Sequence, residues 1–206
     1  MILETVCVGP MQVNCYILAS ADNSSAIIID PGDQERKIRS VLARHSLAPG
    51  FIINTHGHYD HIGCDDVFGV PVYVHKDDVG YLSNPQLNLS GVFALGYHVA
   101  SGIVALEDKQ LLTLDDIELV VMHLPGHTPG GIALVLKKPA QHIAFTGDTL
   151  FCQGIGRSDL SGGNEAQLIK SIRQRLFCLP DDTIIYPGHG PSSTIGEEKR
   201  SNIFLS

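Results

Sequence analysis

The sequence predicts an α/β (α+β) domain in which two β-sheets pack together and helices cover their outer faces. Short apolar runs, separated by glycine and proline turns, recur along both halves of the 206-residue chain. A stretch with helical periodicity follows strands in each half. No segment has the composition of a linker. We therefore expect residues 1–206 to form one domain with a shared core, with the two halves joining near residues 85–105.

The first half contains five apolar runs of strand length, bounded by turn residues. They predict strands at Leu3–Val8, Cys15–Ala19, Ala26–Ile29, Phe51–Asn54 and Val72–Val74. A helix is predicted over Gln34–Ser46, because apolar residues recur there on one face, and Asp33 is the expected N-cap. A short helix is expected over His61–Phe68.

The second half repeats this organisation. Its apolar runs predict strands at Ile117–Met122, Ile132–Leu136, His142–Phe145 and Thr183–Tyr186. Helical spacing of Leu168, Ile172 and Leu176 predicts a helix over Asn164–Cys178. A closing helix is expected over Gly196–Leu205.

Composition excludes several classes of partner. The formal net charge is −8, which disfavours nucleic acid because phosphate binding needs clustered Lys and Arg. No apolar run approaches membrane-spanning length. The five cysteines show no Cys-x-x-Cys spacing, and the N-terminus lacks the pattern of a signal peptide. We therefore expect a cytoplasmic protein without nucleic-acid or membrane partners, either a monomer or a small homo-oligomer.

The segment Thr55–His61 packs three imidazoles and a carboxylate into seven residues, directly after the apolar run Phe51–Ile53. Imidazole and carboxylate are the ligands that zinc and iron prefer. His56 and His58 are two residues apart, so in extended backbone they project to the same side. Asp60 and His61 follow the turn and point elsewhere. Four such groups exceed what one ion usually takes from one loop, so the segment indicates two adjacent ions rather than a solvated polar loop.

Three further ligand-type residues follow apolar strands in the second half. They are His127, Asp148 and His189, and a glycine precedes each one. Glycine allows the backbone to turn sharply at a crowded site. These three complete a set of seven candidate metal ligands at one edge of the sheets. The other five histidines are expected to be structural or on the surface, although His75 ends a strand and is kept as a candidate for the cleft wall.

Together, His56-x-His58-x-Asp60-His61, Gly126-His127-Thr128, Gly147-Asp148-Thr149 and Gly188-His189-Gly190 resemble the metallo-β-lactamase superfamily. The resemblance implies a four-layer αββα sandwich with a dinuclear metal site at its edge. It assigns His56, His58 and His127 to one ion. It assigns Asp60, His61 and His189 to the other, with Asp148 bridging. Asp30, in Asp30-Pro31-Gly32, would support a metal-binding histidine through a hydrogen bond. The ions would be zinc, with iron or manganese as alternatives.

Within this superfamily, Gly147–Phe151 and Gly154–Asp159 resemble the hydroxyacylglutathione hydrolases (glyoxalase II), especially their short bacterial members. That resemblance implies hydrolysis of S-D-lactoylglutathione to D-lactate and glutathione by a metal-bridging hydroxide. Asp60 and Asp148 would hold or relay the proton while binding metal. Arg157 would bind a substrate carboxylate, and an ion pair with Asp159 is the alternative.

The chain departs from the glyoxalase II pattern around glutathione. Pro191 and Asp159 stand where that group has tyrosines that contact glutathione. The sequence ends 17 residues after His189, so no C-terminal glutathione-binding helical domain is expected.

Two alternative activities stay open: an iron-dependent persulfide dioxygenase, and a metallo-hydrolase of another small ester or thioester. A lactamase is disfavoured by the missing export signal, a tRNA-processing nuclease by the charge, and a non-catalytic metal-binding module by the complete ligand set.

Overall fold

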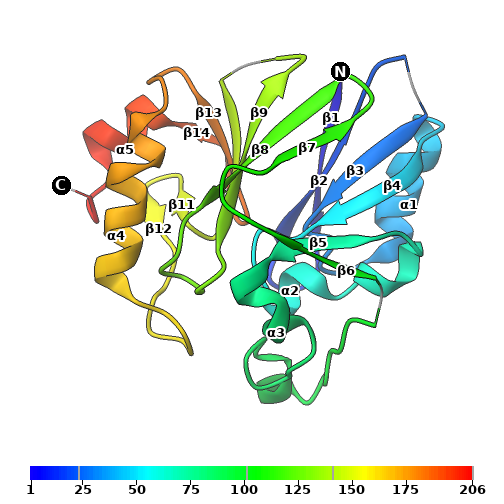
Figure 1. The fold of residues 1–206 in the computed structure, drawn as a ribbon, viewed down its shortest axis with the longest axis horizontal. Helices are drawn as coiled ribbons and strands as arrows, with labels where there is room; N and C mark the ends of the chain where they lie inside the picture. Colours follow the sequence, from blue (N-terminus) through cyan, green and yellow to red (C-terminus); the bar gives the residue numbers. More distant parts are fainter. Residues whose placement is uncertain (23, 101, 141, 206) are drawn as a thin grey trace.

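The computed structural model describes residues 1–22, 24–100, 102–140 and 142–205, and two six-stranded sheets form its centre (Figure 1). The first sheet, in spatial order, contains β1 (Ile2–Val8), β2 (Val13–Ala19), β3 (Ser25–Ile29), β4 (Ala48–Ile53), β5 (Val72–His75) and β6 (Ile103–Leu106). The second contains β14 (Ser193–Thr194), β13 (Ile184–Pro187), β10 (Ile143–Gly147), β9 (Ile132–Lys138), β8 (Ile117–His123) and β7 (Leu111–Leu114). A separate small hairpin joins β11 (Leu150–Phe151) and β12 (Gly154–Ile155).

Alternation along the strands explains why helices cover both outer faces. In β3, Ile27 and Ile29 face the second sheet, while Ala26 and Ile28 face the other way. Both faces of this strand are buried, so each must be covered by another layer.

The outer face of the first sheet packs on α1 (Glu35–Arg44) through Ile38 and Leu42. The outer face of the second sheet packs on α4 (Glu165–Gln174) through Leu168 and Ile172. Figure 1 shows α1 at one side of the paired sheets, with α4 and α5 (Ile195–Ser201) at the other. The predicted αββα sandwich is therefore confirmed.

Several helix boundaries differ from those predicted. The N-cap of α1 is Gln34, in a left-handed conformation, and Asp33 instead accepts a hydrogen bond from the Gln34 N–H at 2.6 Å. The segment His61–Phe68 is not one helix but α2 (Tyr59–Ile62) followed by a 3-10 helix (Asp65–Phe68). The helix ends because the backbone N–H of Cys64 donates to Pro31 O at 2.8 Å.

The two C-terminal helices are shorter than expected. Asn164 caps α4 by accepting a hydrogen bond from the Gln167 N–H, and after Gln174 the chain forms a separate 3-10 helix (Leu176–Cys178). The last helix, α5, begins at Ile195, where the hydroxyl of Thr194 caps it, and ends at Ser201. The expected extension of this helix to Leu205 is wrong.

The strands β6, β7, β11, β12 and β14 were not predicted. β6 pairs in parallel with β5, and β7 pairs antiparallel with β8. The chain crosses from the first sheet to the second between Leu106 and Leu111. The segment before β6 contains α3 (Val79–Leu82) and two 3-10 helices (Lys76–Asp78 and Ser90–Phe93). Among the described residues, no helix is long and apolar enough to span a membrane.

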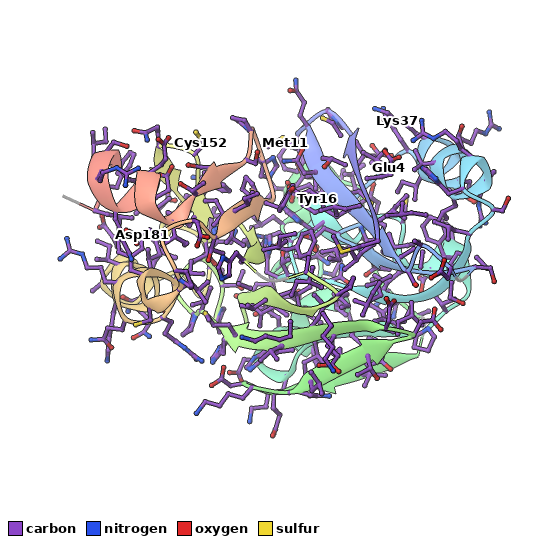
Figure 2. The ribbon with its side chains drawn as sticks, turned by 90° about the horizontal axis from the view of Figure 1, so that it is seen from above. Glu4, Met11, Tyr16, Lys37, Cys152 and Asp181 are labelled. Carbon is purple, nitrogen blue, oxygen red and sulfur yellow. The ribbon has the colours of Figure 1, made fainter. Side chains whose placement is uncertain are left out.

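The two sheets are joined at the edge where the candidate ligands lie. The Tyr16 hydroxyl, on β2, donates to Pro187 O at 2.6 Å, and Asn14 Nδ2 donates to Pro187 O and Gly190 O. Figure 2 shows Tyr16 in the interior, between strands of the two sheets. These bonds fix the loop that carries His189.

Candidate metal centre

All seven candidate ligands lie together at one edge of the sandwich, because each follows the end of a strand. His56 and His58 follow β4, and Asp60 and His61 lie in α2. The other three, His127, Asp148 and His189, follow β8, β10 and β13 respectively. The parallel pairing of β10 with β13 brings the last two to the same edge.

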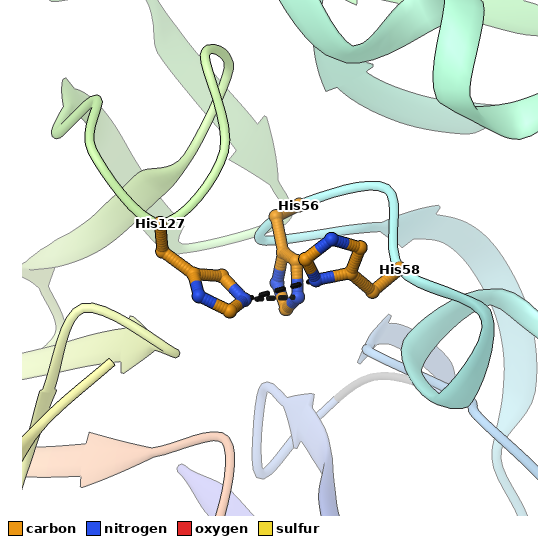
Figure 3. A group of neighbouring side chains, drawn as sticks. All are labelled: His56, His58 and His127. Atoms are coloured by element: carbon orange, nitrogen blue, oxygen red, sulfur yellow. Dashed lines mark hydrogen bonds between the residues drawn. The ribbon is translucent and has the colours of Figure 1, made fainter. Parts of the chain in front are cut away.

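Three imidazoles form one half of the centre (Figure 3). The Nε2 atom of His127 lies 2.9 Å from Nδ1 of His58 and 3.3 Å from Nε2 of His56. All three side chains are buried. Burial and the neighbouring imidazoles lower the pKa of His58 to about 3 and hold the pKa of His56 well below its usual value. His56 and His58 are therefore neutral near pH 7. Nitrogen atoms of all three rings approach one another closely, which suits binding of a divalent cation.

The other half of the centre is rich in carboxylates. The Nε2 atom of His189 lies 3.5 Å from both Asp60 Oδ2 and Asp148 Oδ2. Burial opposes a charge on His61, but Asp148, Asp60 and Asp30 outweigh it and raise the pKa of His61 to about 9. In the same way, Asp148 and Asp60 raise the pKa of His189 to about 10. The field in this half favours positive charge, which either protons or a metal cation can supply.

Asp148 lies between the two halves. Its Oδ1 is 3.5 Å from His61 Nε2, and its Oδ2 is 3.7 Å from His127 Nε2. Burial alone would favour the neutral acid, but the surrounding histidines lower the pKa of Asp148, so it stays ionised. Among the described residues, the buried atoms Asp148 Oδ1 and His61 Nε2 have no hydrogen-bond partner. Buried polar atoms without partners are costly, and a pair of divalent ions would satisfy both.

Asp30 orients two of these histidines, in the place where the sequence predicted a supporting carboxylate. Its Oδ2 is 3.0 Å from His61 Nδ1 and accepts the hydroxyl hydrogen bond of Thr55 at 2.7 Å. The Thr55 oxygen is in turn 3.2 Å from His56 Nδ1. Both Nδ1 atoms are thus placed as donors, which leaves the Nε2 lone pairs directed into the centre.

Backbone carbonyls orient two further histidines. His127 Nδ1 lies 2.7 Å from Arg157 O, and His189 Nδ1 lies 3.0 Å from Met11 O. Each ring therefore presents Nε2 to the centre. The Arg157 carbonyl thereby has a structural role that the sequence did not indicate.

Asp78 is a buried carboxylate that sequence reasoning missed. Its Oδ2 accepts hydrogen bonds from the Gly57 N–H at 3.0 Å and the Thr128 hydroxyl at 2.7 Å. Its Oδ1 accepts from the Gly130 N–H at 2.6 Å. Burial raises the pKa of Asp78, against the effect of these three donors. Asp78 therefore joins the His56–His58 loop to the His127 loop.

Two of the predicted glycines are required by close approach. Gly147 has φ +49°, and a Cβ there would collide with the Thr55 hydroxyl. A Cβ on Gly188 would collide with Asp148 Oδ1 and lie 2.8 Å from His61 Cε1. Gly147 and Gly188 thus let separate ligand loops touch.

A pocket of about 520 Å³ opens over the centre. Five of the candidate ligands line it, namely His58, Asp60, His127, Asp148 and His189. Arg157 also lines the pocket, but its guanidinium forms a bidentate ion pair with Asp159 at 2.8 and 2.9 Å. The structure therefore contains the Arg157–Asp159 ion pair, which was the alternative to binding of a substrate carboxylate by Arg157. His75 does not line the pocket, because its ring stacks on His123 with centroids 3.9 Å apart.

Comparison with known proteins agrees with this geometry. Residues 8–189 match the family described as the metallo-beta-lactamase superfamily. Hydroxyacylglutathione hydrolase GloC of Haemophilus influenzae is 37% identical over 216 residues, which cover 99% of this chain and 98% of that protein.

Three solved structures resemble the chain over nearly its whole length. The BLEG-1 B3 metallo-beta-lactamase is 36% identical with a TM-score of 0.91, and 100% of each chain is covered. TTHA1623 in a di-iron-bound form is 33% identical with a TM-score of 0.82, covering 98% of this chain and 100% of that one. ETHE1 from Myxococcus xanthus is 26% identical with a TM-score of 0.79, covering 98% and 84%. With the family match over residues 8–189, they show that the chain belongs to the metallo-beta-lactamase superfamily, whose members are generally hydrolytic enzymes that bind divalent metal ions.

Proposed function

We propose that the protein is a metal-dependent hydrolase of small thioesters, with hydroxyacylglutathione as the first candidate substrate. The observation that carries this proposal is the position of Asp148, within 3.5 to 3.7 Å of histidines from both halves of the centre. Two ions sharing one carboxylate suit the activation of a water molecule. The name of the GloC relative supports the choice of thioester.

In this proposal His56, His58 and His127 would hold one ion. Asp60, His61 and His189 would hold the other, and Asp148 would be shared between them. Zinc is the first candidate, while iron is supported by the di-iron form of TTHA1623 and manganese by the carboxylates of Asp60 and Asp148, a ligand type that suits it. When bound, the two ions would lower the pKa of a water molecule and polarise the substrate carbonyl.

The residues of the chain set up the rest of the reaction. Attack by water forms a carbon–oxygen bond to the thioester carbonyl, and the carbon–sulfur bond then breaks. The histidines of the carboxylate-rich half lower the pKa values of Asp60 and Asp148, so both stay ionised and can accept a hydrogen bond from the attacking water. A thiol has a pKa of about 8.5, so the thiolate leaves without a strong general acid and takes up a proton afterwards.

The test uses purified protein loaded with zinc, iron or manganese, with the metal content measured. It should hydrolyse S-lactoylglutathione, and Asp148→Ala should lose both hydrolysis and about half of the bound metal. Asp182→Ala is a suitable control, because Asp182 pairs with His142 on the exposed surface. If the fully metallated protein hydrolyses no thioester, the proposal is wrong.

A persulfide dioxygenase is the second candidate, because the three-imidazole half could hold a single iron without help from Asp60 or His189. One bound iron, with oxygen uptake on glutathione persulfide, would support it. The similarity to BLEG-1 calls for a β-lactam assay as well. Two bound ions, with thioester turnover faster than β-lactam turnover, would favour the proposed hydrolase over both.

A further inference from the structure

The walls of the pocket over the metal centre are apolar. They consist of Met11, Leu89, Val92, Phe93, Phe151, Ile155 and Leu160. Three of these large side chains are unusually exposed, Val92 by 72%, Phe93 by 56% and Met11 by 50%. Exposed apolar side chains gathered around a pocket are typical of a ligand-binding surface.

The apolar surface begins beside the candidate ligands. The Phe93 ring packs on Tyr59, with centroids 5.0 Å apart, and Tyr59 directly precedes Asp60. On the other side, the Phe151 ring lies 6.2 Å from the His189 ring. A group attached to a carbonyl at the centre would therefore contact apolar walls at once.

The same walls offer little to a charged group. Among the described residues that line the pocket, Arg157 is the one permanent cation, and Asp159 already neutralises it. A carboxylate or phosphate held against these walls, away from the metal centre, would lose its hydration without gaining a free partner, which is costly. Common thiol carriers bear such charges, so the carrier half of a thioester is better accommodated outside, in solvent.

We propose that the pocket binds an uncharged apolar acyl group, so that the enzyme acts on thioesters of medium-length aliphatic or aromatic acids in preference to lactoyl thioesters. The inference rests on the proposed thioester hydrolysis and names its substrate class. The volume of about 520 Å³ lies in the usual range for pockets that enclose a whole small molecule, whereas lactoyl is a small polar group.

The test keeps the thiol constant and varies the acyl group. Lactoyl, butyryl, hexanoyl and phenylacetyl thioesters of glutathione are compared by kcat/KM with the metal-loaded enzyme. Each buried methylene should raise kcat/KM about fourfold, so hexanoyl should exceed butyryl by about 15-fold. A second series keeps the acetyl group and changes the thiol from glutathione to N-acetylcysteamine and to butanethiol.

Phe93→Ser should reduce the hexanoyl-to-butyryl ratio by several-fold, and Val92→Ser should act in the same direction. Phe204→Ser is the matched control, because Phe204 is exposed by 53% and does not line the pocket. That control should keep the wild-type ratio. Circular dichroism of each variant checks that the fold is retained.

The outcomes separate the two proposals. If lactoylglutathione is hydrolysed as fast as the apolar thioesters, the inference is wrong and the proposed function stands. If kcat/KM follows the apolarity of the thiol and not of the acyl group, the acyl assignment is wrong. If the metallated enzyme hydrolyses none of the thioesters, the proposed function and this inference both fail.

Discussion

Replacing Asp78 by asparagine should loosen the metal centre without touching any candidate ligand. The two oxygens of Asp78 accept three hydrogen bonds, from Gly57, Thr128 and Gly130. An asparagine side chain has only one oxygen. If that oxygen faces Gly57 and Thr128, the amide NH₂ group faces the Gly130 N–H, and two donors meet. In the opposite orientation the NH₂ group faces the Gly57 N–H, which loses its partner, while the Thr128 hydroxyl can rotate and accept a hydrogen bond from the amide.

The magnitude follows from what the two orientations share. One buried N–H loses its partner, which costs about 1–3 kcal/mol, and two charge-assisted bonds become neutral, which costs about 0.5–1 kcal/mol each. The neutral amide is easier to bury than a carboxylate, and the raised pKa of Asp78 shows this desolvation cost. The sum is a loss of about 2–3 kcal/mol in the free energy of unfolding. For a domain of this size, the melting temperature should fall by roughly 5–10 °C.

Asp77→Asn is the matched control, because the Asp77 side chain is 46% exposed and adjacent in sequence. It should change the free energy of unfolding by less than about 0.5 kcal/mol. Melting is followed by circular dichroism for metal-free protein, and metal affinity by competition with a chelator. Asp78→Asn should weaken metal binding about 10- to 100-fold, the usual effect of removing support behind ligands. If Asp78→Asn melts and binds metal as the Asp77→Asn protein does, Asp78 does not hold the two ligand loops together.

Three further outcomes are expected. Gly188→Ala should remove activity and lower the metal content, because a Cβ at Gly188 would collide with Asp148. Gly80→Ala is the control and should do neither, because no atom lies close to the position of a Cβ at Gly80. Equal metal content in the two variants would contradict this prediction. In metal-free protein, stability due to protonated His61 and His189 should be complete below about pH 6.5 and lost as the pH rises through about 9 and 10, so the melting temperature should fall over that window. A flat profile would refute this assignment of charge. Removing metal with a chelator should lower the melting temperature of wild-type protein. Metal ions at a free concentration 100 times their dissociation constant add about 2.7 kcal/mol to the free energy of unfolding. An unchanged melting curve would argue against tight binding.

The grouping of the candidate ligands could be predicted because the signal is local. Each ligand stands within a few residues of an apolar strand and a glycine turn, and strand ends gather at one edge of a sheet. Asp78 had no such signal. It lies in a short 3-10 helix after β5, and its partners Gly57 and Thr128 are 21 and 50 residues away in the chain. The importance of a buried carboxylate whose partners come from distant loops appears only in the folded structure.

The unpredicted strands have a similar explanation. In β6, Val104 and Ala105 are both exposed, so the alternation typical of a half-buried strand is missing. β6 forms because four of its residues pair with β5, from Val72 opposite Ile103 to His75 opposite Leu106. Strands at the edge of a sheet have one neighbour and need less apolar sequence. Pairing, rather than local pattern, therefore determines them.

The substrate is harder to predict than the metal site, and Arg157 shows why. The sequence predicted that the Arg157 guanidinium would bind a substrate carboxylate. In the structure, its guanidinium is held by Asp159 and its carbonyl orients His127. A new carboxylate would have to displace Asp159, an exposed partner, and the net gain from exchanging one exposed ion pair for another is small. Selectivity for the substrate must then come mainly from the apolar walls, which belong to segments as far apart in the chain as Met11, Phe93 and Phe151.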